Sequence, residues 1–294
     1  MTSVAWDRRK LALGRFWSDF RRQRAGMAGL VVLAVAVVLA LIAPLFIDEN
    51  VTSVVTGTGA RWAPPSLDEP FGTDESGRSI LLMAWWGSRT SLLIGFLAAL
   101  LSIVIGMVVG IAAGHFRGWA GAALMRVTDW FLVLPSLVTA LVLAAILGGS
   151  TFTIIVAIGV TTWPSTARLI RAQTLSVEAR PYIERSKALG AGHWHITTRH
   201  VLPNVAPLLL ASTTLEVASA IVTESTLAFL GASANKTSWG TMLRGSYDYG
   251  AATEGAWWYI LIPGLCILAV VMAFTVAGRA LEAVLNPRLR KAGA

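Results

Sequence analysis

The chain has 294 residues, of which 55% are hydrophobic and 14% charged, and its formal net charge is +8. This composition excludes an ordinary water-soluble domain, because charged residues are missing from long stretches and crowd into the connections between them. Nucleic acid is not expected as a partner, since the positive charge lies beside the apolar stretches on one side. The single cysteine, Cys266, excludes an intrachain disulfide and a cysteine-based metal cage.

Long uncharged stretches predict membrane-spanning helices, because about 20 apolar residues are enough to cross the hydrocarbon core of a bilayer. The stretches that contain no charged residue are 25–47, 90–116, 130–167 and 255–278. The third is too long for one crossing, and Gly148, Gly149 and Ser150 supply a turn near its middle. We therefore predict that it forms the third and fourth spans.

A fifth span is predicted at residues 203–230, although this stretch contains Glu216 and Glu224. An acid at a span centre costs about 2.5–3.5 kcal/mol on insertion scales, so both are expected to face protein or a watery cavity. Both are candidates to line a solute path; for Glu216, the stronger, a structural hydrogen bond is the alternative. Asp129 follows Arg126 by three residues, which predicts an ion pair between them.

The distribution of Lys and Arg predicts the orientation of the chain. Most of the 24 basic residues lie before the first span, after the second, after the fourth and after the last. With six spans these segments share one side, which the positive-inside rule makes cytoplasmic, so a multi-pass plasma-membrane protein with both termini inside is predicted. The predicted organisation is a cytoplasmic arm at 1–26, a first span at 27–47, an extracytoplasmic loop at 48–88, a core of five spans at 89–282 with a cytoplasmic coupling segment at 173–203, and a cytoplasmic tail at 283–294.

The long link after the fourth span has the pattern of a compact projection. A helix is predicted around residues 182–189, and Gly190 ends it with a tight turn. A second short helix around residues 193–200 leads to Leu202 and Pro203, which opens the fifth span. A plain basic loop is the alternative, but such a loop does not require the glycine and the Leu-Pro pair at this spacing.

This segment resembles the cytoplasmic signature of permease subunits of bacterial binding-protein-dependent ABC importers. That signature is Glu-Ala-Ala, three residues, Gly, nine residues, Ile, any residue, Leu-Pro. The positions that keep it are Glu184, Gly190, Leu202 and Pro203. The positions that depart from it, in place of two alanines and the isoleucine, are Arg185, Ser186 and His200. In the family this segment docks on the ATPase subunit, so the resemblance implies a coupling site formed by Glu184, Arg185, Ser186, Lys187, Ala188, Leu189, Gly190, Leu202 and Pro203.

A second stretch, residues 72–95, is similar to a pattern typical of dipeptide and oligopeptide permeases and of their nickel-importing relatives. The extracytoplasmic positions that match are Gly72, Thr73, Asp74, Gly77, Arg78, Gly87 and Arg89. Contact with a binding protein is the role we expect for this motif, and an amphipathic helix resting on the outer membrane surface is the alternative. The size of the chain and its short first outer loop resemble those of the C-type permease of a pair.

The resemblance implies an all-α membrane protein with about six transmembrane helices and the type I ABC importer permease fold. The subunit itself is expected to be non-catalytic and to bind no cofactor, with ATP and Mg on partner subunits. The expected partners are a second related permease, two cytoplasmic ATPase subunits, an extracytoplasmic solute-binding protein and membrane lipid. The expected solute is a short peptide, and a nickel chelate or another small solute is the alternative.

Two other classes of protein remain open from the sequence. An ion-coupled secondary transporter would need coupling-ion ligands and usually an internal repeat with broken helices, and the sequence shows neither clearly. A membrane scaffold would have spans but no use for the projection. No metal site is predicted, because His193 and His195 are two positions apart and do not share a helical face.

Overall fold

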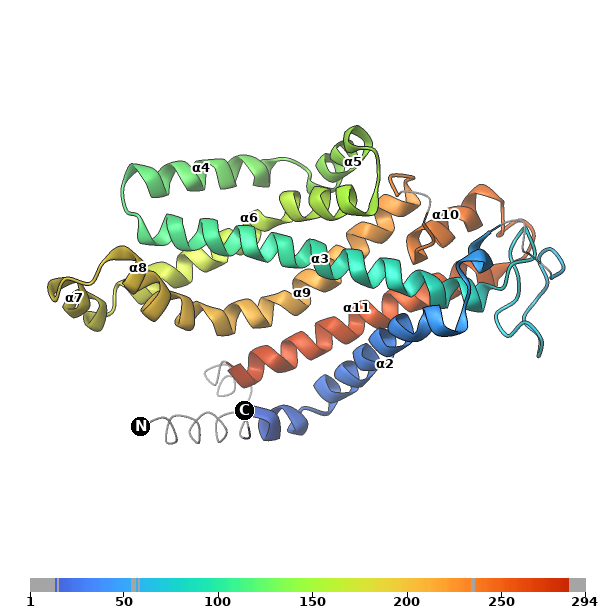
Figure 1. The fold of residues 1–294 in the computed structure, drawn as a ribbon, viewed down its shortest axis with the longest axis horizontal. Coiled ribbons are helices and arrows are strands. Elements are labelled where there is room, and N and C mark those ends of the chain that lie inside the picture. The colour runs from blue at the N-terminus through green and yellow to red at the C-terminus, as the bar shows by residue number, and fades with distance from the viewer. Residues whose placement is uncertain (1–13, 15, 54–56, 58, 234–235, 286–294) are drawn as a thin grey trace.

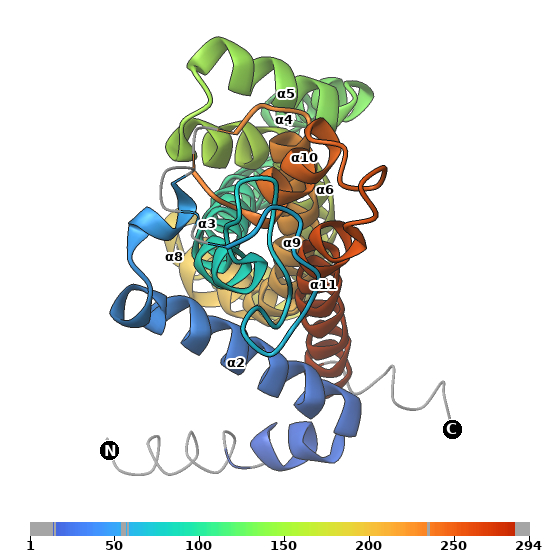
Figure 2. The same cartoon turned by 90° about the vertical axis from the view of Figure 1, so that its right-hand side faces the viewer.

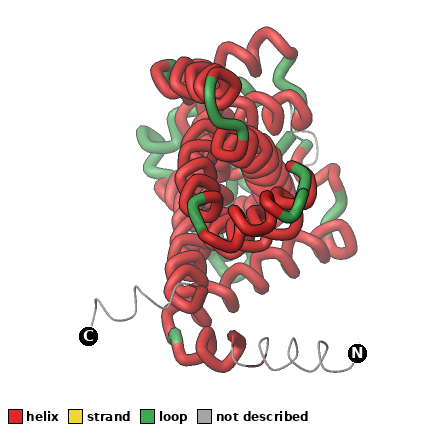
Figure 3. The backbone as a smooth tube through the Cα atoms, turned by 90° about the vertical axis from the view of Figure 1, so that its left-hand side faces the viewer, coloured by secondary structure: helices red, strands yellow, loops and turns green. Residues whose placement is uncertain are grey.

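The computed structural model describes residues 14, 16–53, 57, 59–233 and 236–285. These residues form helices joined by loops, as Figure 3 shows, and their one isolated β-bridge joins Thr73 to Ser79. The predicted all-α membrane fold is therefore confirmed. Half of the predicted N-terminal arm and most of the predicted tail lie outside the described residues.

Five helices in the described chain are long and apolar enough to cross a membrane. They contain α2 (Arg24–Phe46), α3 (Ile80–His115), α6 (Thr151–Glu178), α9 (Leu202–Phe229) and α11 (Trp257–Leu285). Helices suit the bilayer because each satisfies its own backbone hydrogen bonds, which lipid cannot do. The shorter elements are η1 (Glu49–Thr52), α7 (Pro181–Ala188), α8 (His193–Ile196), η3 (Thr197–Val201) and α10 (Trp239–Asp248).

The predicted third span is a broken one. Helix α4 (Trp119–Val133) and helix α5 (Ser136–Leu147) meet at an angle of 88°. Pro135 lies at the break; it has no N–H to donate, and it pushes Leu134 into the extended conformation, with ψ 132°. The expected turn is present, with Gly148 at φ +89°, and the structure adds the break at Pro135.

Helix α3 begins earlier than the end of the predicted outer loop. It starts at Ile80, inside the range 48–88, and Arg89 lies in its third turn. The guanidinium of Arg89 lies 4.6 Å from the ring centroid of Trp86. A charge held over an aromatic face fits the interfacial part of a helix, so Arg89 does not mark the helix start.

Helices α3 and α6 pack closely along a stripe of small residues. Gly106, Gly110 and Gly114 of α3 face α6, and a Cβ added to any of them would lie 2.6–2.7 Å from an atom of that helix. Glycine at this spacing lets two helices approach closely. The resulting van der Waals contacts hold the helices together, because lipid provides no hydrophobic driving force between them. The stripe is thus used for packing within the chain itself.

The helices form an elongated bundle in which α3 lies along α6 and α9, as Figure 1 shows. Helices α2 and α11 flank α9 and α3 on one side, and the broken pair α4–α5 covers α6 on the other. Outward apolar side chains such as Val133 and Ile146, which are 83% and 74% exposed, suit contact with lipid.

The two ends of the bundle differ. We call one end the knob end; it carries α7 and α8, and α3 and α6 end there. We call the other the loop end; residues 59–79 and α10 cover it, as Figure 2 shows from that side. A solute path through the bundle would run between these two ends.

Candidate functional site

The projection at the knob end consists of α7, a turn at Gly190 and α8. Pro181 begins α7, at a position where a missing N–H is not needed. Gly190 has φ +88°, a left-handed conformation that glycine adopts without strain, and the N–H of Ala191 donates to the carbonyl of Ser186 at 3.0 Å. The predicted helix, glycine turn and second helix are therefore present.

Leu202 and Pro203 form the start of α9, as predicted. The structure adds that α8, η3 and α9 form one helix from His193 to Phe229. In the wide turn of η3 the N–H of Leu202 donates to the carbonyl of Thr197, five residues earlier, and Pro203 follows directly at the start of α9. The second half of the projection is therefore the end of a membrane-spanning helix.

The outer face of the projection combines charged and apolar side chains. The predicted coupling residues of this segment that are exposed are Glu184, Arg185, Lys187, Ala188, Leu189 and Gly190, whereas Ser186 is half-buried. Leu189 and Trp194 are 89% and 80% exposed, although both are large and apolar. Such side chains beside charges are typical of a surface that another protein covers.

The inner face of the projection is packed against the spans. Ile183 of α7 and Ile196 of α8 are buried in one apolar cluster with Ile170 and Val177 of α6. Burying an Ile side chain fully, relative to leaving it exposed, stabilises the packing by about 1.5–3 kcal/mol. The projection is therefore fixed to α6 as well as continuous with α9.

A polar cluster joins the same elements, and the sequence did not predict it. Glu178 Oε1 accepts a hydrogen bond from His115 Nδ1 at 2.6 Å, and Oε2 accepts one from Lys187 Nζ at 2.6 Å. His115 Nε2 lies 2.8 Å from Nδ1 of His193. Glu178 and His115 are buried, whereas Lys187 and His193 reach solvent. We call these four residues the knob cluster.

The charges of the knob cluster depend on one another. Glu178 is the last residue of α6, where the helix dipole disfavours a carboxylate, so its stabilisation comes from Lys187 and His115. Because Glu178 accepts from His115 Nδ1, that nitrogen carries a proton. The other nitrogen either accepts from His193 or, in the imidazolium form, donates to it.

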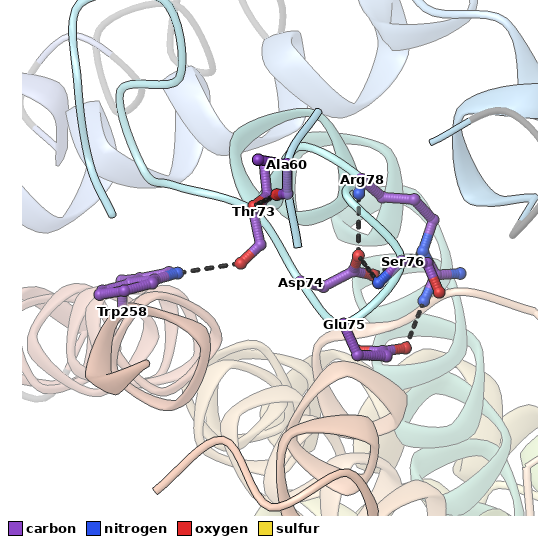
Figure 4. A network of polar contacts seen from close by, with 7 residues as sticks. All are labelled: Ala60, Thr73, Asp74, Glu75, Ser76, Arg78 and Trp258. Atoms are coloured by element: carbon purple, nitrogen blue, oxygen red, sulfur yellow. Dashed lines mark hydrogen bonds and ion pairs between the residues drawn. The ribbon is translucent and has the colours of Figure 1, made fainter. Parts of the chain in front are cut away.

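The motif residues at the loop end form hydrogen bonds with one another and with α11, as Figure 4 shows. Asp74 is buried, and its Oδ1 accepts from the backbone N–H groups of Ser76 and Arg78, both at 2.8 Å. Its Oδ2 accepts from Arg78 Nε. Thr73 is also buried, and its carbonyl accepts from Trp258 Nε1 of α11 at 3.0 Å. The motif therefore fastens the loop to α11.

The remaining motif residues lie in or beside the loop of residues 59–79, which we call the cap. Gly72 and Gly77 have φ +70° and +75°, which requires glycine at both turns. Gly87 lies against the backbone of Ser238, next to α10. Burial raises the pKa of the Glu75 carboxyl, and the Asp74 charge adds to the rise, while Arg78 opposes it. Contact of this cap with a binding protein remains a prediction.

The two acids predicted for the solute path lie in different surroundings. Glu216 of α9 lines a cavity of about 420 Å³ between α4, α5, α6 and α9, and its Oε1 accepts from Thr166 Oγ1 at 3.0 Å. Glu224 is only 1% exposed, and its Oε2 accepts from Ser225 Oγ at 3.3 Å. It lies beside Ser91 and Ser238, which belong to α3 and the start of α10, and is not on this cavity.

The ion pair predicted for Asp129 has a different partner. Asp129 Oδ1 accepts from Arg168 of α6 at 2.7 Å, so the expected pairing with Arg126 is wrong. Both paired side chains are about half exposed. Arg168 is farther from Asp129 in the sequence than Arg126 is, but the packing of α4 on α6 brings its side chain to Asp129. An exposed ion pair of this kind contributes about 0–1 kcal/mol to stability.

These features define a class: an integral membrane helix bundle with an exposed helical projection at one end and a polar cavity among its spans. The sequence matches the family described as binding-protein-dependent transport system inner membrane component over residues 106–291. Residues 12–65 match the N-terminal transmembrane domain of oligopeptide transport permease C.

Curated relatives match nearly the whole chain. The dipeptide transport system permease protein of Bacillus subtilis is 35% identical over 277 residues, which cover 94% of this chain and 85% of the relative. The oligopeptide transport system permease protein of the same organism is 34% identical, with 94% and 90% covered. The probable D,D-dipeptide transport system permease protein of Escherichia coli is 35% identical, with 88% and 87% covered.

The chain belongs to the family of inner-membrane components of binding-protein-dependent transport systems. It is a multi-pass permease subunit of an ABC importer with the type I permease fold, and its resemblance to the C-type peptide permeases is confirmed.

Proposed function

We propose that this permease subunit passes short peptides across the cytoplasmic membrane, using ATP hydrolysis on two separate ATPase subunits. Its relatives in Bacillus subtilis and Escherichia coli are named as dipeptide or oligopeptide permeases, at 34–35% identity. The chain itself would carry out no chemistry and bind no cofactor. ATP and Mg would be held by the ATPase subunits.

The observation that carries the proposal is the exposed projection fixed to the spans. Leu189 and Trp194 give it an apolar outer surface, and Ile183 and Ile196 give it a buried inner one. The ATPase subunits would cover the outer surface. Because α8 continues into α9, a rotation of the projection would tilt that span, which is a rigid-body route to alternating access.

The orientation that this requires agrees with the charges. The knob end carries the basic residues of the projection, and the basic start of α2 lies toward it, so it would face the cytoplasm, with both termini. The loop end would face outward, where the Asp74 cap and α10 would receive the solute-binding protein. A second, related permease would close the solute path on the open side of the cavity at Glu216.

Transport by the complete complex tests the proposal. The chain would be reconstituted in proteoliposomes with its partner permease, ATPase subunits and binding protein, and uptake of radiolabelled dialanine would be measured. We expect uptake that requires ATP inside the proteoliposomes and that continues when the proton gradient is collapsed. Uptake that continues without ATP but stops when the proton gradient collapses would contradict the proposal, and so would ATP-driven uptake of nickel alone.

A further inference from the structure

The cavity beside Glu216 is rich in hydroxyl groups, and the direction of their hydrogen bonds determines what they offer to a ligand. Thr161, Thr162 and Ser212 line the cavity, and each donates its O–H to a carbonyl three or four residues earlier in its own helix, at 2.8, 2.9 and 3.1 Å. A hydroxyl has one proton, so the groups that remain are lone pairs. These side chains therefore present acceptors to the cavity.

Proline also changes the backbone of α6 beside the cavity. Pro164 lines the cavity inside α6 and has no N–H, so it cannot donate to the carbonyl of Val160 one turn earlier. That carbonyl is left without its helical donor on the side of Pro164. Groups of this kind in a membrane-spanning helix are tolerated where they meet a cavity or another polar group.

Glu216 gives this wall a carboxylate without a cationic partner among the residues that line the cavity. Those residues include Glu216 but no Lys, Arg or His. Thr166 holds one carboxylate oxygen at 3.0 Å, and Ser165 is a second neutral neighbour. An acid at this depth is costly unless a partner compensates it, so the site is suited to a cation that arrives from outside the chain.

The metal-ligating side chains that are lacking indicate which kind of cation the cavity suits. Within the described residues there is no group of three His, Cys, Asp or Glu side chains that could hold a metal ion. An ammonium group has three N–H donors and a positive charge, which complement one carboxylate and several lone pairs. The cavity volume of about 420 Å³ lies within the range of small-ligand sites.

We propose that Glu216 binds the α-ammonium group of the transported solute while the solute occupies the cavity between α4, α5, α6 and α9. The inference rests on the proposed function, because it takes the solute to be a short peptide. Thr166 positions the carboxylate, and the Thr161, Thr162 and Ser212 hydroxyls accept the remaining ammonium hydrogens. The site selects peptides with a free amino terminus.

The test compares dialanine with N-acetyl-dialanine in the reconstituted complex, each delivered on binding protein whose loading is checked by mass spectrometry. The wild-type complex is expected to transport the free amine at least about ten times faster than the acetylated form. Glu216→Gln keeps the shape and the Thr166 contact but removes the charge, and it should bring the two rates within about two-fold of each other. Glu216→Asp should keep part of the preference.

Glu282→Gln is the matched control, because it removes a carboxylate from α11 that is not on the cavity. It should keep the wild-type preference and the wild-type rate of basal ATP hydrolysis. Wild-type preference in Glu216→Gln would overturn the ammonium site and leave the proposed function in place. A wild-type complex without ATP-dependent dialanine uptake would overturn both.

Discussion

His115 and His193 lie 2.8 Å apart between Nε2 and Nδ1, and this contact joins the last residue of α3 to the first residue of α8. Glu178, the last residue of α6, contacts the other side of His115, and Lys187 of α7 contacts Glu178. The knob cluster thus ties two spans to both helices of the projection. Motion of the projection has to move α3 and α6 with it or break these contacts.

Replacing Glu178 should loosen the projection without unfolding the bundle. Glu178→Gln removes the charge that stabilises Lys187 and His115, and the loss of these hydrogen bonds should cost about 1–3 kcal/mol locally. Amide hydrogen exchange over residues 181–201 should become faster, while exchange in α11 is unchanged. Asp129→Asn breaks an exposed ion pair and is the control; equal effects of both changes would contradict the role of the cluster.

The turn at Gly190 offers a test with a neighbouring control. A Cβ at Gly190 or at Gly192 would meet nothing within 4 Å, but only Gly190 has a positive φ, of +88°. Gly190→Val should therefore strain the turn by about 1–3 kcal/mol and uncouple ATP hydrolysis from uptake, with membrane insertion intact. Gly192→Val should transport normally, since its backbone is already extended, with φ −72° and ψ 166°. Normal uptake in Gly190→Val would count against the coupling assignment.

The close approach of α3 and α6 predicts that a single methyl group is harmful at Gly110. A Cβ there would lie 2.6 Å from the carbonyl oxygen of Ala167, so Gly110→Ala should destabilise the bundle by about 1–3 kcal/mol. Gly264 of α11 has nothing within 4 Å, and Gly264→Ala should be neutral or stabilising. Thermal unfolding in detergent measures both, and equal midpoints would contradict the packing.

The cap at the loop end should depend on the charge of Asp74. Asp74→Asn weakens the contacts with Arg78 and leaves a donor facing donors, so it should destabilise the cap by about 1–3 kcal/mol. Limited proteolysis of residues 59–79 should become faster. Asp68→Asn, at an exposed position of the same loop, should have no effect, and a similar effect of both changes would show that Asp74 is not special.

The sequence predicted the spans because each depends on local composition. Runs without charge predicted helices, and Gly148 and Gly190 ended helices where a left-handed turn was expected. The break at Pro135 has a signal in the sequence, because a proline inside a predicted span favours a break. The early start of α3 has no such signal, because a charge such as Arg89 ends an uncharged run, whereas in the structure Trp86 shields it.

The knob cluster was beyond prediction because its members are far apart in the chain. His115 precedes Glu178 by 63 residues and His193 by 78. A lone histidine at the end of a span has no local signal that names its partner. The contact of His193 with His115 depends on how α3, α6 and α8 pack. The pairing of Asp129 failed for the same reason.

Site-specific photo-crosslinking from position 189 tests the central claim most directly. Leu189 would be replaced by p-benzoylphenylalanine in the complete complex, with the same replacement of Tyr249 beside α10 as the control. We predict a covalent adduct between position 189 and an ATPase subunit, and none between position 249 and that subunit. An adduct of position 189 with the solute-binding protein, or with lipid alone, would contradict the account.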